Sequence, residues 1–242
     1  WVLTPRVAAS DIVLTRTANV LNKPIAEFVV AMALALFKGL PAFLNQQRER
    51  QWRRPETLAT MVGATAVIIG AGAIGRETAV RLRAMGMRVL GMKRTPEPLA
   101  EFDEVVGSDG LENLLRQADL LVLACPLTPE THHLVGSAQF ALMKRTAVIV
   151  NIARGAVMVE ADLIEALTTG AIAGAGLDVF DAEPLPEDSP LWALPNVIVT
   201  PHVSYLADEN EPAMLEEFGE NLQRFLDGAP LLNVLKSREL GY

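Results

Sequence analysis

The chain has 242 residues, half of them hydrophobic, so it can form one large domain with a sizeable core or one domain and part of a second. Its formal net charge of −8 argues against a nucleic-acid-binding surface and against binding to an anionic membrane. The single cysteine, Cys125, excludes an internal disulfide framework and fits a reducing compartment, so we expect a cytoplasmic protein.

The sequence of the N-terminal part predicts one brief strand and one long helix. Ile12 to Leu14 is typical of a short strand, and the helix is expected from Pro24 to about Leu40, because proline suits a first helical turn. The longest wholly apolar run, Phe28 to Phe37, has ten residues. A membrane-spanning helix needs about 20 residues, so we expect a buried helix instead. The polar stretch from Asn45 to Arg54 is the candidate domain boundary.

A glycine-rich motif follows the next apolar run. Ala66 to Ile69 leads into Gly70, Gly72 and Gly75, which fill the three glycine places of G-x-G-x-x-G, and a helical spacing comes next. These glycines allow a tight turn, a close approach to a pyrophosphate, and close packing of helix on strand. The alternative is a merely structural turn, but the position between strand and helix favours a dinucleotide site. Its expected contacts are Gly70, Gly72, Ala73, Ile74 and Gly75.

The residues after the second expected strand bear on the choice of cofactor. An NAD-dependent enzyme usually has an acidic residue there, which binds the ribose 2′-hydroxyl. Here the sequence has Lys93, Arg94 and Thr95, and no acidic residue before Glu97. Two cations and a hydroxyl suit a 2′-phosphate, which favours NADP(H) over NAD(H). The alternative is that both cations are simply solvated.

From Thr65 onward, apolar strand-like runs alternate with helical segments. Strands are expected at 65–69, 88–92, 104–106, 120–124, 147–151, 173–178 and 197–200, with helices such as 111–117 and 160–167 between them. This alternation predicts an α/β fold, a doubly wound parallel sheet of the Rossmann type. Because ligands bind beyond the carboxyl ends of such strands, the residues that follow each strand are the candidate site residues.

Four polar side chains follow three successive strands of this expected sheet. Arg154 follows the fifth strand, Asp178 and Glu183 the sixth, and His202 the seventh. A lone arginine or histidine usually has a structural role, but four such groups on one rim favour a functional site. The other histidines, His132 and His133, are adjacent, and the sequence has no spaced set of metal ligands, so no metal site is expected.

Five linked motifs carry a resemblance to a known family. GAGAIG, CPLTPET, NIARGAVMVEADLIEAL, GLDVFDAEPLP and NVIVTPHVS occur in the order and spacing of the D-isomer-specific 2-hydroxyacid dehydrogenases, which the chain resembles from near Ile12 to its C-terminus. The resemblance, in particular to glyoxylate and hydroxypyruvate reductases, implies reversible reduction of a 2-keto acid to a D-2-hydroxy acid by a nicotinamide cofactor. It implies catalytic roles for Arg154, Glu183 and His202. It also implies cofactor contacts by Pro126, Thr131, Ala153, Arg154, Asp178 and His202, with Asp178 against the nicotinamide carboxamide.

The chemistry of the reaction supports these roles independently. A hydride that reaches a keto carbon leaves negative charge on the oxygen, so a proton donor is needed, and imidazole titrates near neutrality. A neighbouring carboxylate favours the protonated ring and sets its tautomer, so we expect a pair between Glu183 and His202. Arg154 offers a planar, permanently charged fork to the substrate carboxylate or carbonyl oxygen.

The resemblance also implies a division into domains. In the family, the nucleotide domain is inserted into a smaller, flavodoxin-like substrate domain that both chain ends form. We therefore expect a partial substrate domain and linking helix at 1–48, the dinucleotide-binding domain at 49–205, and a C-terminal helix, near 216–226, and tail at 206–242. Most of the N-terminal substrate segment is expected to be absent, which would expose an apolar patch along 28–37.

The expected partners are a small 2-keto or 2-hydroxy acid and a second copy of the chain, without nucleic acid or membrane. Two alternatives stay open at this point. One is a nicotinamide-sensing binding protein similar to the corepressors of this fold, and the other is a catalytically weak fragment.

Overall fold

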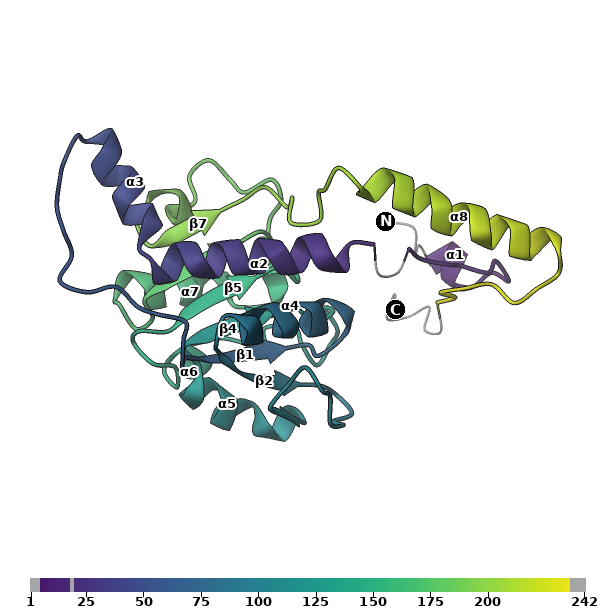
Figure 1. Ribbon diagram of the computed structural model, residues 1–242, viewed down its shortest axis with the longest axis horizontal. Coiled ribbons are helices and arrows are strands. Elements are labelled where there is room, and N and C mark those ends of the chain that lie inside the picture. The colour runs from purple at the N-terminus through teal and green to yellow at the C-terminus, as the bar shows by residue number, and fades with distance from the viewer. Residues whose placement is uncertain (1–4, 18–19, 236–242) are drawn as a thin grey trace. The chain divides into compact units, whose positions relative to one another are not determined.

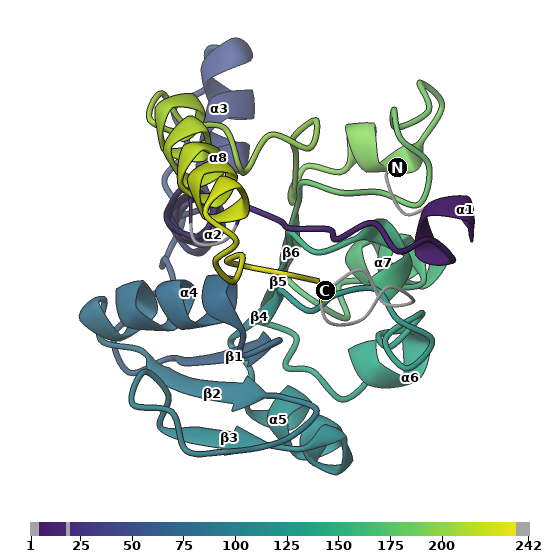
Figure 2. The ribbon, with the colours of Figure 1, turned by 90° about the vertical axis from the view of Figure 1, so that its right-hand side faces the viewer.

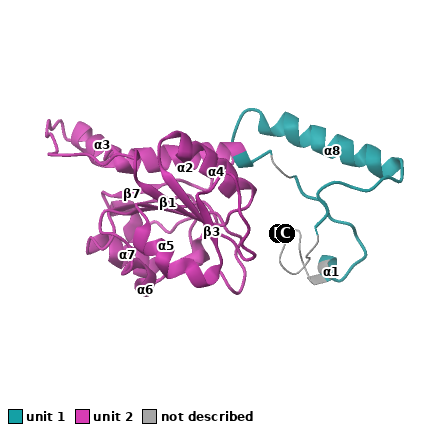
Figure 3. Ribbon diagram, turned by 60° about the horizontal axis from the view of Figure 1, so that its bottom comes forward, with its two compact units in different colours: residues 1–22, 206–242 teal, residues 23–205 magenta. Residues whose placement is uncertain are grey.

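The computed structural model describes residues 5–17 and 20–235 (Figure 1). Contacts between residues divide the chain into two compact units, one of residues 23–205 and one that combines residues 1–22 with 206–242 (Figure 3). The boundary after Tyr205 coincides with the expected one. The N-terminal boundary lies at Asn22, whereas the sequence predicted a boundary after residue 48.

The larger unit contains a seven-stranded sheet in which every neighbouring pair is parallel, in the order β3-β2-β1-β4-β5-β6-β7. The strands are β1 (Thr65–Ile69), β2 (Arg88–Met92), β3 (Glu104–Val106), β4 (Leu120–Leu123), β5 (Val148–Asn151), β6 (Gly174–Leu177) and β7 (Val197–Val199). The predicted doubly wound α/β fold is therefore confirmed, and the strand bounds differ from the predicted ones by one residue at most. From β1, the chain adds β2 and β3 on one side, and then β4 to β7 on the other side. Such sheets bind their ligands at this switch point, between β1 and β4.

Helices cover both faces of this sheet. The α-helices are α1 (Pro5–Ala8), α2 (Asn22–Phe37), α3 (Leu40–Arg48), α4 (Ala73–Ala84), α5 (Leu111–Gln117), α6 (Ser137–Phe140), α7 (Glu160–Thr168) and α8 (Asn210–Leu226). Short 3-10 turns occupy Ser108–Gly110, Gly155–Val157 and Pro190–Ala193. Helices α5, α6 and α7 lie on one face of the sheet, and α2 and α4 lie on the other (Figure 2).

Helix α2 packs directly on β6, because two glycines of that strand leave room for it. A Cβ atom on Gly176 would lie 2.9 Å from the Met32 sulfur, and one on Gly174 would lie 3.2 Å from a methyl group of Leu36. No large hydrophobic side chain between Phe28 and Phe37 is among the exposed ones. The expected apolar patch along this helix is therefore wrong, since the helix covers the sheet of its own unit.

Helix α3 begins after a left-handed Gly39, with φ of 63°, and carries Pro41 in its first turn. Within the described residues, no single helix is long and apolar enough to cross a membrane; α2 and α3 together, bent by 66°, pass such a test only by length and composition.

The smaller unit contains α8 and the segments beside it. The Asn221 amide donates to the Leu232 carbonyl (3.1 Å) and accepts the Leu232 N–H (2.8 Å), which holds the following chain against the helix. The expected strand at Ile12 to Leu14 is wrong. Within residues 5–17 and 20–235, the only β structure of this unit is an isolated antiparallel bridge between Thr15 and Val234. Helix α8 begins six residues earlier than expected, since Pro212 lies in its first turn, where proline is tolerated.

Candidate active site

The glycine motif forms the turn between β1 and α4, and two of its glycines are required by packing. Gly70 has a left-handed φ of 107°, and a Cβ on it would lie 2.6 Å from the backbone of Ala124 and Cys125. A Cβ on Gly75 would lie 2.1 Å from the Gly70 carbonyl oxygen. Gly72 is different, because a Cβ there would meet no atom within 4 Å. The first turn of α4, with Ala73 and Ile74, thus faces open space and can direct its N–H groups at a pyrophosphate.

The residues after β4 form a turn that hydrogen bonds hold in place. The Thr131 hydroxyl donates to the Pro126 carbonyl (2.7 Å) and accepts the Thr128 N–H (2.8 Å). Burial raises the pKa of the Cys125 thiol to about 11, so this thiol stays protonated at neutral pH and serves as a packing group. The cofactor contacts expected of Pro126 and Thr131 stay predictions.

Arg154 is presented by a rigid turn after β5. The buried Asn151 amide donates to the Arg154 carbonyl (2.9 Å) and accepts the Ala153 N–H (3.0 Å). Gly155 packs on the backbone after β6 so closely that a Cβ would lie 2.0 Å from the Phe180 carbonyl carbon. The Arg154 guanidinium donates to the Ala153 carbonyl (2.6 Å) while its side chain stays exposed.

Asp178 holds the segment that carries His202. Its fully buried carboxylate accepts three hydrogen bonds, from the Thr200 hydroxyl (2.6 Å), the Val203 N–H (2.9 Å) and the Ser204 N–H (2.9 Å). His202 lies between these donors in a left-handed conformation, with φ of 56°. Such a conformation costs roughly 1–3 kcal/mol, whereas each hydrogen bond to a charged group contributes about 1.5–3 kcal/mol. The carboxylate therefore outweighs the strain and fixes the histidine backbone.

Glu183 is in hydrogen-bond contact with His202. Its Oε2 lies 2.7 Å from His202 Nδ1, and its Oε1 accepts the Phe180 N–H (3.0 Å). Burial acts to raise the pKa of Glu183, but the hydrogen bonds from His202 and from the Phe180 N–H outweigh it and lower that pKa. The carboxylate is thus ionised at neutral pH. We assign the Nδ1 proton from this network, which leaves Nε2 for a substrate.

The positive charge of Arg154 also lowers the pKa of Glu183, so this arginine lies within electrostatic reach of the Glu183 carboxylate. Asp178 was expected against the nicotinamide carboxamide. That contact stays a prediction. The structure adds a second role for Asp178, which holds the backbone around His202 and which the sequence did not reveal. Among the described residues, no cluster of three or more His, Cys, Asp or Glu could hold a metal ion.

Near the end of β2, the structure adds a partner for Lys93, which the sequence analysis selected, and a second cation–carboxylate pair, which it did not. Lys93 pairs with Glu97, and the Arg76 Nε and Nη2 atoms donate to Glu101 Oε1 (3.0 and 2.7 Å). Arg76 directly follows the third glycine of the motif, which is the signal that could have found it. On the opposite side of the site, the Tyr205 ring stands edge-on to the His202 ring with centroids 6.4 Å apart.

Comparisons with known proteins identify the family that this chain matches. The family model for the D-isomer specific 2-hydroxyacid dehydrogenase, NAD binding domain, matches residues 30–204. A glyoxylate reductase from Thermococcus gammatolerans is 39% identical over 225 residues, which cover 90% of this chain and 67% of the relative. A glyoxylate/hydroxypyruvate reductase B from Citrobacter koseri is 37% identical over 238 residues, which cover 96% of this chain and 74% of the relative.

Two solved structures are also similar. One is a D-isomer specific 2-hydroxyacid dehydrogenase from Xanthobacter autotrophicus in complex with NADPH and MES, with a TM-score of 0.88 and 35% identity, covering 100% of this chain and 98% of the other. The second is an NADPH-dependent glyoxylate/hydroxypyruvate reductase from Sinorhizobium meliloti in complex with NADP and sulfate. It has a TM-score of 0.88 and 33% identity, and covers 100% of this chain and 76% of the other.

The different surroundings of two glycines yield a matched prediction. Gly75→Ala should lower the free energy of unfolding by about 1–3 kcal/mol, because its Cβ has no room. Gly72→Ala, at φ of −89°, should leave that free energy within about 0.5 kcal/mol of the wild-type value and yet weaken NADPH binding, since its Cβ points into the space proposed for the pyrophosphate. Denaturant unfolding and fluorescence titration measure the two effects. Unweakened binding by Gly72→Ala would contradict the placement.

Proposed function

Because this chain belongs to the D-isomer-specific 2-hydroxyacid dehydrogenase family, we propose that it reduces a small 2-keto acid to a D-2-hydroxy acid, with NADP(H) as its preferred cofactor. His202 is the proposed general acid and base, Glu183 its partner, and Arg154 the residue that orients the substrate. The observation that carries the proposal is the 2.7 Å contact between Glu183 and His202 on the rim of the sheet. The backbone beside this histidine is held by hydrogen bonds to Asp178.

The proton chemistry follows from this pair. When bound, the nicotinamide supplies a hydride to the keto carbon. His202 donates its Nε2 proton to the carbonyl oxygen, so the negative charge that develops there becomes a neutral hydroxyl. Glu183 stabilises the protonated ring before this transfer and keeps the Nδ1 proton in place. In the reverse direction, the neutral ring accepts the hydroxyl proton at Nε2.

Arg154 is proposed to hold the substrate. Its guanidinium is planar and permanently charged, so it can bind a carboxylate or a carbonyl oxygen through two parallel hydrogen bonds. The buried Asn151 amide and the tight packing of Gly155 fix its backbone. A positioned fork of this kind restricts the orientation of the keto carbon relative to His202.

The preference for NADP(H) is supported by the cations after β2 and by the relatives. Lys93 and Arg94 stand where an NAD enzyme usually has an acidic residue. The Sinorhizobium meliloti relative is named NADPH-dependent, and the Thermococcus and Citrobacter relatives are named for glyoxylate or hydroxypyruvate. Glyoxylate and hydroxypyruvate are therefore the substrates to test first.

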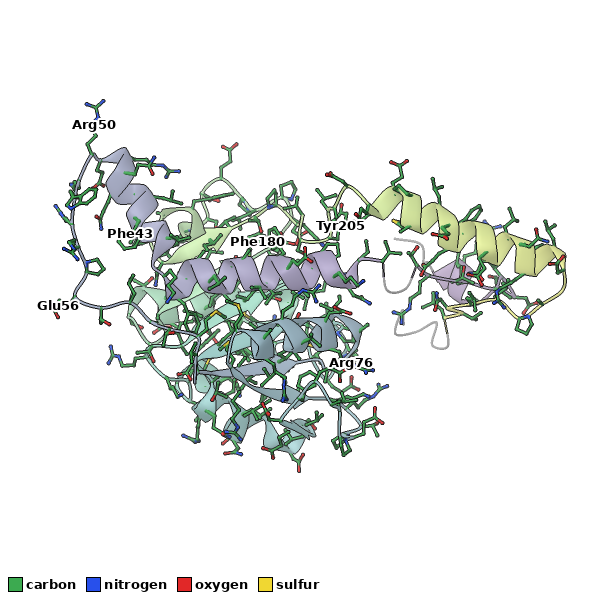
Figure 4. All side chains as sticks on the ribbon, viewed as in Figure 1. Phe43, Arg50, Glu56, Arg76, Phe180 and Tyr205 are labelled. Carbon is green, nitrogen blue, oxygen red and sulfur yellow. The ribbon has the colours of Figure 1, made fainter. Side chains whose placement is uncertain are left out.

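A homodimer is also proposed, through the extended segment between α3 and β1. Trp52 is 94% exposed there, beside a hollow of about 840 Å³ that Phe43 and Leu58 help to line (Figure 4 labels Phe43). Residues 48–54 carry four arginines and one glutamate, whereas the chain as a whole has a net charge of −8. A second copy thus offers a surface of opposite average charge for this segment, and a buried indole is typical of such interfaces.

The dimer predicts that Trp52→Ala shifts the sedimentation equilibrium toward the monomer. Trp192→Ala is the matched control, because this indole is 54% exposed and donates to the Pro186 carbonyl (2.9 Å) within its own loop. It should sediment as the wild type does. A monomeric wild-type protein at micromolar concentration would refute the dimer.

The experiment that tests the function measures reduction of glyoxylate and hydroxypyruvate with NADPH and with NADH. His202→Ala should lower turnover by about 10²–10⁴-fold, because a positioned proton donor contributes that much. The affinity for NADPH, from fluorescence titration, should stay near the wild-type value.

His132→Ala removes an exposed imidazole from a different loop and should keep wild-type turnover. Near wild-type turnover by His202→Ala would mean that another group donates the proton. Cofactor binding without turnover by the wild-type protein would instead favour a nicotinamide-sensing protein.

A further inference from the structure

Two cation–carboxylate pairs lie at the carboxyl end of β2 and the start of α4. Lys93 bonds to Glu97, and Arg76 bonds to Glu101 through its Nε and Nη2 atoms (3.0 and 2.7 Å; Figure 4 labels Arg76). The pKa of Glu97 is lowered mainly by its hydrogen bond to Lys93, and the charge of Arg76 contributes too. Glu97 is therefore within electrostatic reach of both cations.

The two carboxylates differ in how firmly they are held. The Glu101 side chain is 19% exposed and receives both Arg76 hydrogen bonds on one oxygen. The Glu97 side chain is 58% exposed and follows β2 in an irregular segment. Exposed ion pairs contribute little to stability, so Glu97 can turn away from Lys93 into water at small cost. Glu101 has no comparable freedom.

Arg76 keeps donors available while it is bonded to Glu101. A guanidinium has five N–H donors, and two of them face Glu101. The side chain is 51% exposed, so the remaining edge is open to a further anion. Because Glu101 holds the guanidinium in place, little side-chain freedom would be lost when such an anion binds.

We propose that Glu97 is a stand-in for the ribose 2′-phosphate of NADP(H). In the free protein, the Glu97 carboxylate is bonded to the Lys93 ammonium. The carboxylate is displaced when the phosphate binds to Lys93 and to Arg76. The inference rests on the proposed nicotinamide-dependent function. It makes Glu97 a specificity-determining residue, because its charge competes with and repels the 2′-phosphate but has no such effect on the 2′-hydroxyl of NAD(H).

The test is fluorescence titration of the wild-type protein and Glu97→Gln with NADPH and with NADH. The variant should bind NADPH about two- to fivefold more tightly, the range expected for loss of one exposed ion-pair competitor. Its affinity for NADH should not change. Arg76→Gln should weaken NADPH binding by about tenfold or more, since it removes a charge-assisted contact to the phosphate, with NADH again unchanged.

Glu112→Gln on α5 is the matched control. Glu112 forms an exposed pair with Arg116 (3.9 Å), so its loss removes the same charge from the same unit without touching the end of β2. Both affinities should stay at their wild-type values. This control separates a local effect of Glu97 from a change in net charge.

Several outcomes would overturn the inference. If Glu97→Gln weakens NADH binding, the carboxylate accepts a ribose hydroxyl instead of imitating a phosphate. Unchanged NADPH affinity, or equal tightening of NADPH and NADH, would also contradict it, as would absence of NADPH binding. The titration measures binding alone, so a protein that follows these expectations but does not reduce keto acids would contradict the proposed function and leave this inference standing.

Discussion

The site depends on one buried carboxylate. Asp178, at the end of β6, accepts hydrogen bonds from the residues on both sides of His202, and so ties the end of β7 to its neighbouring strand. These bonds hold His202 in a left-handed conformation, which is uncommon for a residue other than glycine. In that conformation the imidazole Nδ1 lies 2.7 Å from Glu183 Oε2, on the loop after β6. Asp178 thus positions the His202 backbone, and the Phe180 N–H holds the Glu183 carboxylate beside the ring.

Close backbone packing brings the other loops to the same rim. Gly70 touches the backbone after β4, Gly75 touches Gly70, and Gly155 touches the backbone at Phe180, each at a distance that excludes a Cβ atom. These contacts join the ends of β1, β4, β5 and β6. The proposed pyrophosphate-binding turn and the proposed substrate-binding Arg154 are therefore parts of one rigid edge of the sheet.

The fold could be predicted closely because its signals are local. The strands are short, mostly apolar runs, and all except β4 end at or just before a polar or glycine residue. Helix Leu111–Gln117 has the predicted bounds. Predictions failed where partners decide the outcome. Ile12 to Leu14 has a strand-like composition, but among residues 5–17 only Thr15 forms a bridge, to Val234. The apolar helix α2 could not be assigned to a layer, because nothing in its own pattern reveals the room that Gly174 and Gly176 leave for it.

Part of the candidate site was also predictable from the sequence. Strand order and motif spacing placed Arg154, Glu183 and His202 on one rim, and the chemistry of ketone reduction paired the last two. Lys93 and Glu97 are four residues apart in an irregular segment, so no helical spacing predicted their pairing. The hydrogen bonds of Asp178 around His202 could not be foreseen either, because they join the ends of two different strands. No periodicity in a sequence encodes which side chains meet across two turns.

The proposed function depends most on Glu183 and His202 acting as one proton-transfer pair in the reduction. The most direct test is the pH dependence of keto-acid reduction by the wild-type protein and by Glu183→Gln at saturating cofactor. The variant removes the ionised partner of the proposed proton donor, so its keto-acid reduction should decline at a lower pH than that of the wild type. An unchanged pH profile, with cofactor affinity intact, would contradict the claim.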